Sequence, residues 1–323
     1  MLSPDPASIP EATPEDLIPL VVILGPTAAG KTEIAIALAR RLGAEIVSAD
    51  SRLFYIGLDI GTAKPSPAER EQVAHHLIDV TPPDKVWSLA TFQAEANRII
   101  REIDARGKLP FLVGGTGQYI HAVTEGWEIP KAHASPTLRL ALERWATEIG
   151  AGGLHDRLAL LDPQAGQTID PSNVRRTVRA LEVIFSTGRI FSAQRRRHPS
   201  PYQVLQLGLT RPRSQLYHRI DLRIDGMIQA GLVEEVRGLL AQGYAPDLPA
   251  LSAIGYREII AYLQDRISLD EAVRLIKRQT RVFVRRQANW FKENDPAICW
   301  FSVDEKTIDA METKIRAWRT SLK

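Results

Sequence analysis

The sequence predicts an α/β fold in which helices flank a parallel sheet, with an all-helical insertion domain and a helical C-terminal region. Three observations support this prediction. Short apolar strands and helical stretches alternate as far as residue 125, which is typical of a parallel sheet. Between residues 136 and 189 only helical periodicity is found. After one further strand, the chain is helical again from residue 215 to about residue 292.

The first elements follow from local patterns. Residues Leu20–Leu24 are aliphatic and largely β-branched and are followed by Gly25, which is expected of a buried parallel strand. Residues Glu33–Leu42 have helical spacing, and Gly43 directly after them suits a helix C-cap. Residues Ala44–Ala49 form the second predicted strand.

The next helix and strand complete the alternating region. A helix over Thr91–Arg106 stops at Gly107. Residues Pro110–Val113 form another buried strand, and a glycine-rich turn over residues 114–117 follows it.

The domain boundaries are predicted from the point at which a strand pattern returns after the helical region. Residues Tyr202–Leu209 alternate in polarity and return the chain to the sheet. We therefore predict a catalytic domain made of residues 20–125 and 201–323, including the C-terminal helices. A helical insertion domain over residues 126–200 interrupts it.

The composition is that of a globular protein. Of the 323 residues, 44% are hydrophobic and 24% are charged, which argues against a fibre or a wholly disordered chain. No apolar run approaches the roughly 20 residues that span a bilayer. The single cysteine, Cys299, cannot form an internal disulfide, which suggests a reducing compartment.

Residues 1–19 are predicted to be a disordered leader. They contain five prolines and four acids but no Lys or Arg, and they show no apolar periodicity. They also lack the basic start and apolar run of a secretory signal, so we predict a cytoplasmic protein that has no contact with a membrane. Without this segment the net charge rises from +3 to +7.

A phosphate-binding motif follows the first strand. Residues 25–32 read GPTAAGKT and match the pattern G-x-x-x-x-G-K-[ST] between a predicted strand and a predicted helix. Glycine lets the backbone approach phosphate oxygens, and the helix N-terminus favours an anion. Lys31 supplies a positive charge, and the Thr32 hydroxyl is the candidate ligand of Mg²⁺. The predicted phosphate-binding residues of this P-loop fold are Gly25, Pro26, Thr27, Ala28, Ala29, Gly30, Lys31 and Thr32.

The acid that usually accompanies such a loop is missing from its expected place. Most P-loop proteins bind ATP or GTP and hold Mg²⁺ with an Asp that ends a second strand. Here Pro110–Val113 is followed by glycines, and Asp50 instead follows the strand after the loop helix. The carboxyl ends of parallel strands face the ligand crevice. The Asp50 carboxylate could therefore bind Mg²⁺ through water, act as a general base, or cap a helix or turn, and its position leaves these alternatives open.

Two segments are basic and nearly free of acids. Residues 274–292 hold seven Lys and Arg and no acid, interleaved with Phe283, Trp290 and Phe291. Residues 175–197 hold seven arginines and one acid, Glu182. Such clusters favour nucleic acid as the partner, and a solvated or salt-bridged helix face is the alternative.

Several motifs together resemble one family. In chain order they are GPTAAGKT (25–32), SADS (48–51), YIGLDIGTAKP (55–65), GGTGQY (114–119), RTVRALE (176–182), IGYRE (254–258) and TRVFVRRQANWF (280–291). From about Val21 to Trp300 the chain is similar to the tRNA dimethylallyltransferases, the isopentenyltransferases of tRNA, in their bacterial form. The resemblance implies transfer of a dimethylallyl group from dimethylallyl diphosphate to N6 of the adenosine at position 37, next to the anticodon, with release of diphosphate.

The resemblance also assigns roles to residues. The phosphate loop would hold the diphosphate of the donor, Asp50 would be the general base, and Thr116 and Arg223 would help bind or activate the diphosphate. The partners would be the tRNA anticodon stem-loop and the donor, with Mg²⁺ and without an obligate protein partner. The implied tRNA contacts are Asp50, Ser51, Arg52, Leu53, Thr116, Arg139, Arg175, Arg176, Arg179, Ile254, Gly255, Tyr256, Arg257, Arg281, Arg285, Arg286 and Gln287.

Three other functions fit a phosphate loop. The chain could be a kinase of a small molecule or nucleotide, or a non-catalytic RNA-binding GTPase or ATPase. It could also be an isopentenyltransferase that modifies a free adenine nucleotide. The two basic segments favour tRNA as the acceptor over this last alternative.

Overall fold

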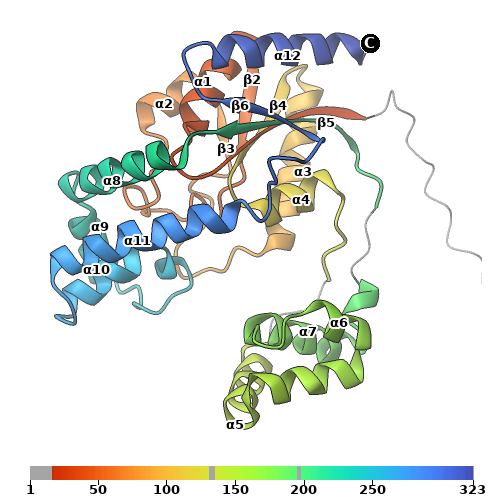
Figure 1. The fold of residues 1–323 in the computed structure, drawn as a ribbon, viewed down its shortest axis with the longest axis vertical. Helices are drawn as coiled ribbons and strands as arrows, with labels where there is room; N and C mark the ends of the chain where they lie inside the picture. The colour runs from red at the N-terminus through yellow and green to blue at the C-terminus, as the bar shows by residue number, and fades with distance from the viewer. Residues whose placement is uncertain (1–16, 131–134, 195–197, 323) are drawn as a thin grey trace, which may run out of the picture. The chain divides into compact units, whose positions relative to one another are not determined.

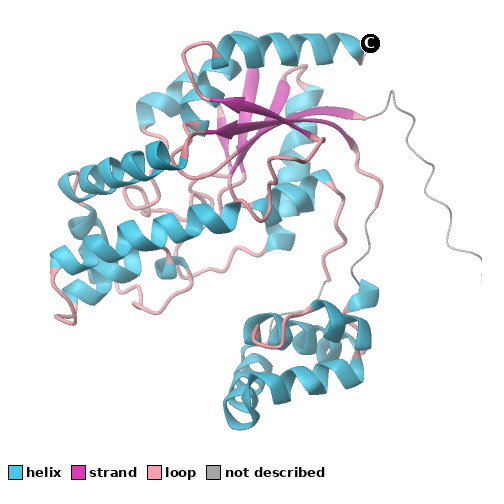
Figure 2. Cartoon of the chain, in the orientation of Figure 1, coloured by secondary structure: helices cyan, strands magenta, loops and turns pink. Residues whose placement is uncertain are grey.

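The computed structural model describes residues 17–130, 135–194 and 198–322 (Figure 1). The described residues divide into two compact units, one within residues 1–124 and 200–323 and the other within residues 125–199. Figure 2 shows that the strands belong to the first unit, which we call the sheet unit. The second, which we call the helical unit, contains helices and loops in its described part.

The sheet unit is built on six parallel strands in the order β3-β2-β4-β1-β5-β6, which confirms the predicted fold class. The central strand β1 pairs with β4 on one side and with β5 on the other. The strands are β1 (Ile18–Leu24), β2 (Ala44–Ser48), β3 (His75–His76), β4 (Leu109–Gly114), β5 (Tyr202–Thr210) and β6 (Ile298–Ser302).

The start of β1 corrects the predicted leader. Ile18 and Pro19 belong to the strand, because Ile18 pairs with Tyr202 of β5 and its N–H donates to the Pro201 carbonyl at 3.0 Å. The rest of the predicted leader, residues 1–16, lies outside the described residues.

Two apolar clusters cover the two faces of the sheet. Because side chains alternate along a strand, Val21 and Ile23 of β1 pack into one cluster, and Leu20 and Val22 pack into the other. The first cluster includes residues of α1, α8, α9, α10, α11 and α12, and the second includes residues of α3 and α4. The helices of this unit are α1 (Lys31–Leu42), α2 (Pro67–Gln72), α3 (Leu89–Ala105), α4 (Gly117–Thr124), α8 (Arg213–Gln229), α9 (Leu232–Ala241), α10 (Tyr256–Leu263), α11 (Leu269–Gln287) and α12 (Thr307–Ser321), with the short 3-10 helix η3 (Ala250–Ser252).

The helical unit has its own core. Leu142, Leu154 and Leu181 are among the buried side chains that pack its helices together. Its elements are α5 (Pro136–Leu161), which is kinked at Gly150, α6 (Pro163–Thr168), α7 (Val174–Thr187) and the 3-10 helix η2 (Ser192–Gln194). Within the described ranges, no helix of the chain is long and apolar enough to cross a membrane.

Glu45 joins three neighbouring segments at the start of β2. Its buried carboxylate accepts hydrogen bonds from His76 of β3 at 2.7 Å, from Arg106 at 2.7 Å and from Lys108 at 2.9 Å. Burial by itself raises the pKa of Glu45, but the hydrogen bonds from Lys108, His76 and Arg106 outweigh it and lower the pKa to about 2. The ionised carboxylate therefore stabilises this side of the sheet.

We expect Glu45→Gln to lower the free energy of unfolding near pH 7 by about 3 kcal/mol, the energy that corresponds to a pKa shift from 4.5 to about 2. Because the folded pKa lies below the unfolded pKa, this contribution is complete above about pH 4.5 and is lost as the pH falls through about 2. Urea unfolding at several pH values measures it. The variant Glu102→Gln, which breaks an exposed pair with Arg98, is the control and should cost under about 1 kcal/mol. If the loss of free energy of unfolding in Glu45→Gln does not become smaller toward pH 2, the ionised Glu45 carboxylate is not its source.

Candidate active site

The phosphate loop lies between the central strand and α1. Gly25 follows β1, and a Cβ added to it would lie 2.6 Å from the Leu209 carbonyl oxygen of β5, so only glycine fits this approach. Gly30 has a φ of 103° and forms the N-cap of α1. The free N–H groups of the first turn of α1 therefore face the same loop, which is the arrangement that binds an anion.

Lys31 is the cation inside this loop. Its ammonium group donates to the carbonyls of Gly25 at 3.0 Å and Pro26 at 2.9 Å. Burial lowers the pKa of Lys31 to about 8, although the Asp50 carboxylate raises it, and the Arg223 guanidinium lowers it further. A lysine whose charge is only partly compensated by the protein is suited to bind a phosphate chain.

Asp50 and Arg223 belong to the same electrostatic cluster. Asp50 follows β2, and its Oδ1 accepts the Arg52 N–H at 3.0 Å, so one oxygen caps a turn. Arg223 of α8 has its pKa lowered mainly by burial, while Asp50 raises it. The sheet unit thus brings together three predicted site residues, Lys31, Asp50 and Arg223, from α1, the end of β2 and α8.

The loop after β4 completes this edge of the sheet. Gly114 packs on the backbone of Ala49, where a Cβ would lie 2.4 Å from the Ala49 carbonyl oxygen. Thr116 stands at the start of α4, and its carbonyl accepts hydrogen bonds from Tyr119 at 2.9 Å and Ile120 at 3.2 Å. Thr116 therefore lies two residues after Gly114, whose backbone contacts the residue before Asp50.

Two arginines that were not predicted as site residues support the phosphate loop. The Arg211 Nε donates to the Ala29 carbonyl at 3.0 Å, and the Arg219 Nε donates to the Ala28 carbonyl at 2.9 Å. Both come from the segment that follows β5, which also carries Arg223. The only signal in the sequence is that this segment is rich in arginine, and it does not show that the side chains reach backward to the loop.

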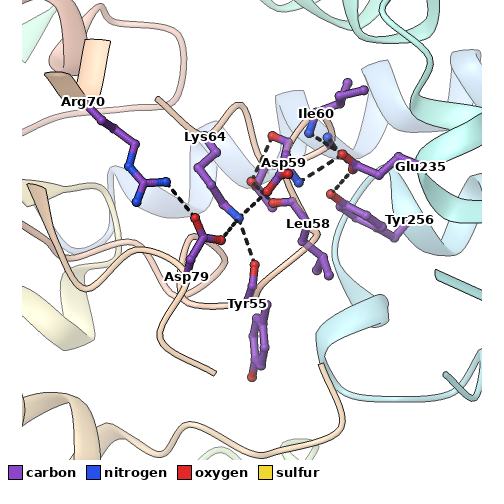
Figure 3. A network of polar contacts seen from close by, with 11 residues as sticks. Tyr55, Leu58, Asp59, Ile60, Lys64, Arg70, Asp79, Glu235 and Tyr256 are labelled. Atoms are coloured by element: carbon purple, nitrogen blue, oxygen red, sulfur yellow. Dashed lines mark hydrogen bonds and ion pairs between the residues drawn. The ribbon is translucent and has the colours of Figure 1, made fainter. Parts of the chain in front are cut away.

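A polar network around the buried Lys64 side chain holds the segment that follows Asp50 (Figure 3). The Lys64 ammonium donates to the Tyr55 carbonyl at 2.9 Å and forms ion pairs with Asp59 and Asp79. The Lys64 side chain is only 4% exposed, so it is held by these acceptors rather than by water.

The same network ties this segment to α9 and α10. The Glu235 carboxylate accepts the N–H groups of three consecutive residues, Asp59, Ile60 and Gly61, and the Tyr256 hydroxyl at 2.5 Å (Figure 3). A Cβ on Gly61 would lie 2.5 Å from the Tyr256 ring. The conformation of this loop therefore depends on helices that follow it by more than 170 residues.

Carboxylates for a metal are scarce at this site. The described residues contain no group of three or more His, Cys, Asp or Glu side chains that could hold a metal ion. Thr32 lies exposed in the first turn of α1. This donor set fits Mg²⁺ that is bound mainly through the oxygens of a phosphate ligand, with one hydroxyl from the protein.

Comparison with known proteins decides the family. A family model described as IPP transferase matches residues 53–294, and one described as Isopentenyl transferase matches residues 18–85. A protein named tRNA dimethylallyltransferase from Roseiflexus sp. (strain RS-1) is 50% identical over 303 residues, 94% of this chain and 99% of that protein. The chain belongs to the tRNA dimethylallyltransferase family. The family and the type of enzyme, a prenyltransferase, are confirmed as predicted.

Further tRNA dimethylallyltransferases and solved structures agree. The protein of that name from Thermomicrobium roseum is 48% identical over 287 residues, 89% of this chain and 87% of that protein. The crystal structure of a tRNA isopentenylpyrophosphate transferase from Bacillus halodurans is 40% identical, with a TM-score of 0.71 over 94% of this chain and 98% of that one. A eukaryotic dimethylallyltransferase acting on tRNA is 25% identical, with a TM-score of 0.77 over 92% of this chain and 77% of that one.

The residues implied as tRNA contacts of a tRNA dimethylallyltransferase differ in exposure within the sheet unit. Arg257, Arg285 and Arg286 are exposed. Those that are partly exposed are Asp50, Ser51, Arg52, Leu53, Thr116, Ile254 and Arg281. Gly255, Tyr256 and Gln287 are buried, so the structure places them beneath the surface that their neighbours form.

Some of these basic side chains are already engaged within the protein. Arg52 donates to the carbonyls of Pro249 at 2.9 Å and Ala250 at 3.2 Å, and Arg281 pairs with Asp221 at 2.5 Å. Arg285 and Arg286 are exposed cations in the last turn of α11.

In the helical unit, Arg139, Arg175 and Arg176 are exposed, and Arg179 is partly exposed. Arg139 and Arg179 both pair with Glu182, at 2.7 and 2.8 Å. The Glu182 side chain is buried, and the hydrogen bonds from Arg179 and Arg139 lower its pKa against the effect of burial. These two guanidinium groups are thus held in place on the surface of α5 and α7.

We expect inorganic diphosphate to bind more weakly as the pH rises through about 8, because Lys31 then loses its positive charge. Bound diphosphate should raise the pKa of Lys31, so binding above pH 8 should take up a proton. Calorimetric titrations near pH 7 and pH 9, in two buffers of different ionisation enthalpy, measure both effects. Lys31→Met is the control for the titration of diphosphate itself. An equal loss of affinity with pH in wild type and variant would contradict the role of Lys31.

Proposed function

We propose that this chain takes dimethylallyl diphosphate as the donor and the N6 amine of the adenosine at position 37, next to the anticodon, as the acceptor. The observation that carries this proposal is the phosphate loop with Lys31 and Arg223 beside one carboxylate, Asp50. The two cations can stabilise the negative charge of a diphosphate leaving group. The carboxylate can accept the one proton that the amine must lose. Family membership supports the prenyl group and tRNA as the two substrates.

The donor is held by its diphosphate. The N–H groups at the start of α1, the Lys31 ammonium and the Arg223 guanidinium would bind its oxygens. Thr32 would hold Mg²⁺ together with those oxygens, and the ion, when bound, would offset part of the charge on the leaving group. Arg211 and Arg219 keep the carbonyls of Ala29 and Ala28 paired, and the N–H groups at the start of α1 remain for the ligand.

The transfer is one displacement. Asp50 accepts a hydrogen bond and then a proton from the N6 amine, the nitrogen forms a bond to C1 of the dimethylallyl group, and the C1–O bond to diphosphate breaks. Both electrons of that bond leave with the diphosphate. Thr116, at the start of α4 and in the loop after β4, the strand that pairs with β2, would contact the diphosphate or the acceptor base. Because an exocyclic amine is a poor nucleophile, positioning supplies much of the rate.

The acceptor is proposed to be the anticodon stem-loop of tRNA. The exposed arginines of α11 and α7 supply charges for its phosphates. The target base must leave its stack to reach the reacting carbon. Since tRNA is the substrate, we propose that the reaction takes place in the cytoplasm.

We expect Asp50→Asn to keep tRNA binding but to lose about 10²–10⁴ in kcat, the usual contribution of a general base. The assay incubates wild type and variant with labelled dimethylallyl diphosphate, Mg²⁺ and tRNA that lacks this modification. Reactions without tRNA but with free adenine nucleotide, and a measurement of ATP hydrolysis, test the other functions. Label on tRNA from the wild type alone supports the proposal. ATP consumption without labelled tRNA would overturn it, and an unchanged kcat in the variant would remove Asp50 as the base.

We expect the double variant Arg285→Glu and Arg286→Glu to weaken tRNA binding at least tenfold and to lower the salt dependence of binding, because two phosphate contacts are lost. Filter binding at several salt concentrations measures both quantities. The affinity for inorganic diphosphate should stay at the wild-type value. The double variant Lys314→Glu and Arg319→Glu, at two exposed positions of α12, changes the net charge by the same amount and is the matched control. A loss as large in this control would show a general effect of charge and not a site on α11.

A further inference from the structure

Gln287 is a buried polar residue at the end of the basic helix α11. Its side chain is 5% exposed, whereas its neighbours Arg285 and Arg286 face solvent. The amide bridges two loops, because Oε1 accepts the Thr27 N–H at 2.9 Å and Nε2 donates to the Gly115 carbonyl at 3.0 Å. Thr27 belongs to the phosphate loop after β1, and Gly115 belongs to the loop after β4.

The two bridged loops are in close contact. A Cβ added to Gly115 would lie 2.4 Å from the Gln287 amide nitrogen, 3.1 Å from the Gly25 carbonyl oxygen and 3.4 Å from the Lys31 ammonium. Gln287, Gly25 and Lys31 thus surround one point of the Gly115 backbone. Thr116 is the next residue, so the position of the bridge also affects the distance between Lys31 and Thr116.

We propose that Gln287 is a positioning residue that holds the phosphate loop against the loop after β4, and that it does not act as a contact to tRNA. The inference rests on the proposed function, since the phosphate loop is taken to bind the diphosphate of the donor. Gln287 sets the orientation of the Thr27 peptide and thereby the shape of the loop around Lys31. Because Gln287 is buried, contacts to RNA are made by the exposed residues that precede it on α11.

The chemistry of the bridge requires an amide. Thr27 supplies a donor and Gly115 an acceptor, so the side chain between them must accept at one end and donate at the other. Methionine has the length of glutamine, but it cannot donate and its sulfur accepts only weakly, so it leaves the Gly115 carbonyl without a partner and the Thr27 N–H with a poor one. Because both groups are in the backbone of ligand-binding loops, the loss should change donor binding first.

The test compares Gln287→Met with Gln279→Met, a matched control on the same helix about two turns earlier. Steady-state transfer with labelled dimethylallyl diphosphate at saturating tRNA gives kcat and the donor KM. Calorimetry with inorganic diphosphate and Mg²⁺ gives a binding constant that does not depend on catalysis, and filter binding gives the tRNA Kd. Gln287→Asn keeps the amide but is too short to reach both loops. It replaces Gln287→Met in the same measurements if the methionine variant does not fold.

For Gln287→Met we expect about a tenfold rise in the donor KM and in the diphosphate Kd, with a tRNA Kd within twofold of wild type. Gln279→Met should leave all three at wild-type values. A diphosphate Kd and donor KM within twofold of wild type would overturn the proposal, and so would a weaker tRNA Kd with unchanged diphosphate binding. If the wild type transfers no label, the proposed function fails, whereas the calorimetric comparison still decides whether Gln287 shapes the loop.

Discussion

The site depends on one constraint: a loop that turns its N–H groups toward an anion must have its remaining backbone groups paired by the rest of the protein. In this chain Lys31 pairs the carbonyls of Gly25 and Pro26, Arg219 pairs that of Ala28, and Arg211 pairs that of Ala29. Gln287 accepts the Thr27 N–H. Apart from Lys31, these partners lie 182–260 residues away in sequence, so the loop needs the C-terminal helices to keep its shape.

The C-terminal helices consequently serve the site in two ways. Their buried apolar residues pack on one face of the sheet, and polar side chains that are buried or partly buried, such as Gln287 and Glu235, reach the loops. Their exposed residues, among them Arg285 and Arg286, form a basic surface. A substitution on α11 can therefore affect the donor or the RNA, depending on whether the side chain is buried or exposed.

Most elements of the sheet unit could be predicted, because their hydrophobic patterns are local. The strand predicted over Tyr202–Leu209 is β5, and the helix predicted over Glu33–Leu42 is α1, which begins two residues earlier at Lys31. The edge strand β6 was not predicted, and the sequence does not give the bounds of β3. A strand of two residues, such as His75–His76, has no periodicity to read, and its pairing with β2 exists only in the folded sheet.

The sequence by itself determined the phosphate loop, the parallel α/β fold and the family, because each is encoded in residues close together or in motifs whose order is preserved. Asp50, Thr116 and Arg223 were assigned by resemblance, and their roles stay predictions. Only the tertiary structure decided which of the long polar side chains bind the loops of the site. Arg211 and Arg219 donate to carbonyls of the phosphate loop and Gln287 is buried between two loops, although nothing in the surrounding sequence distinguishes them from their neighbours. The physical reason is that a long polar side chain finds its partner through space, and a helical pattern says only which face it occupies.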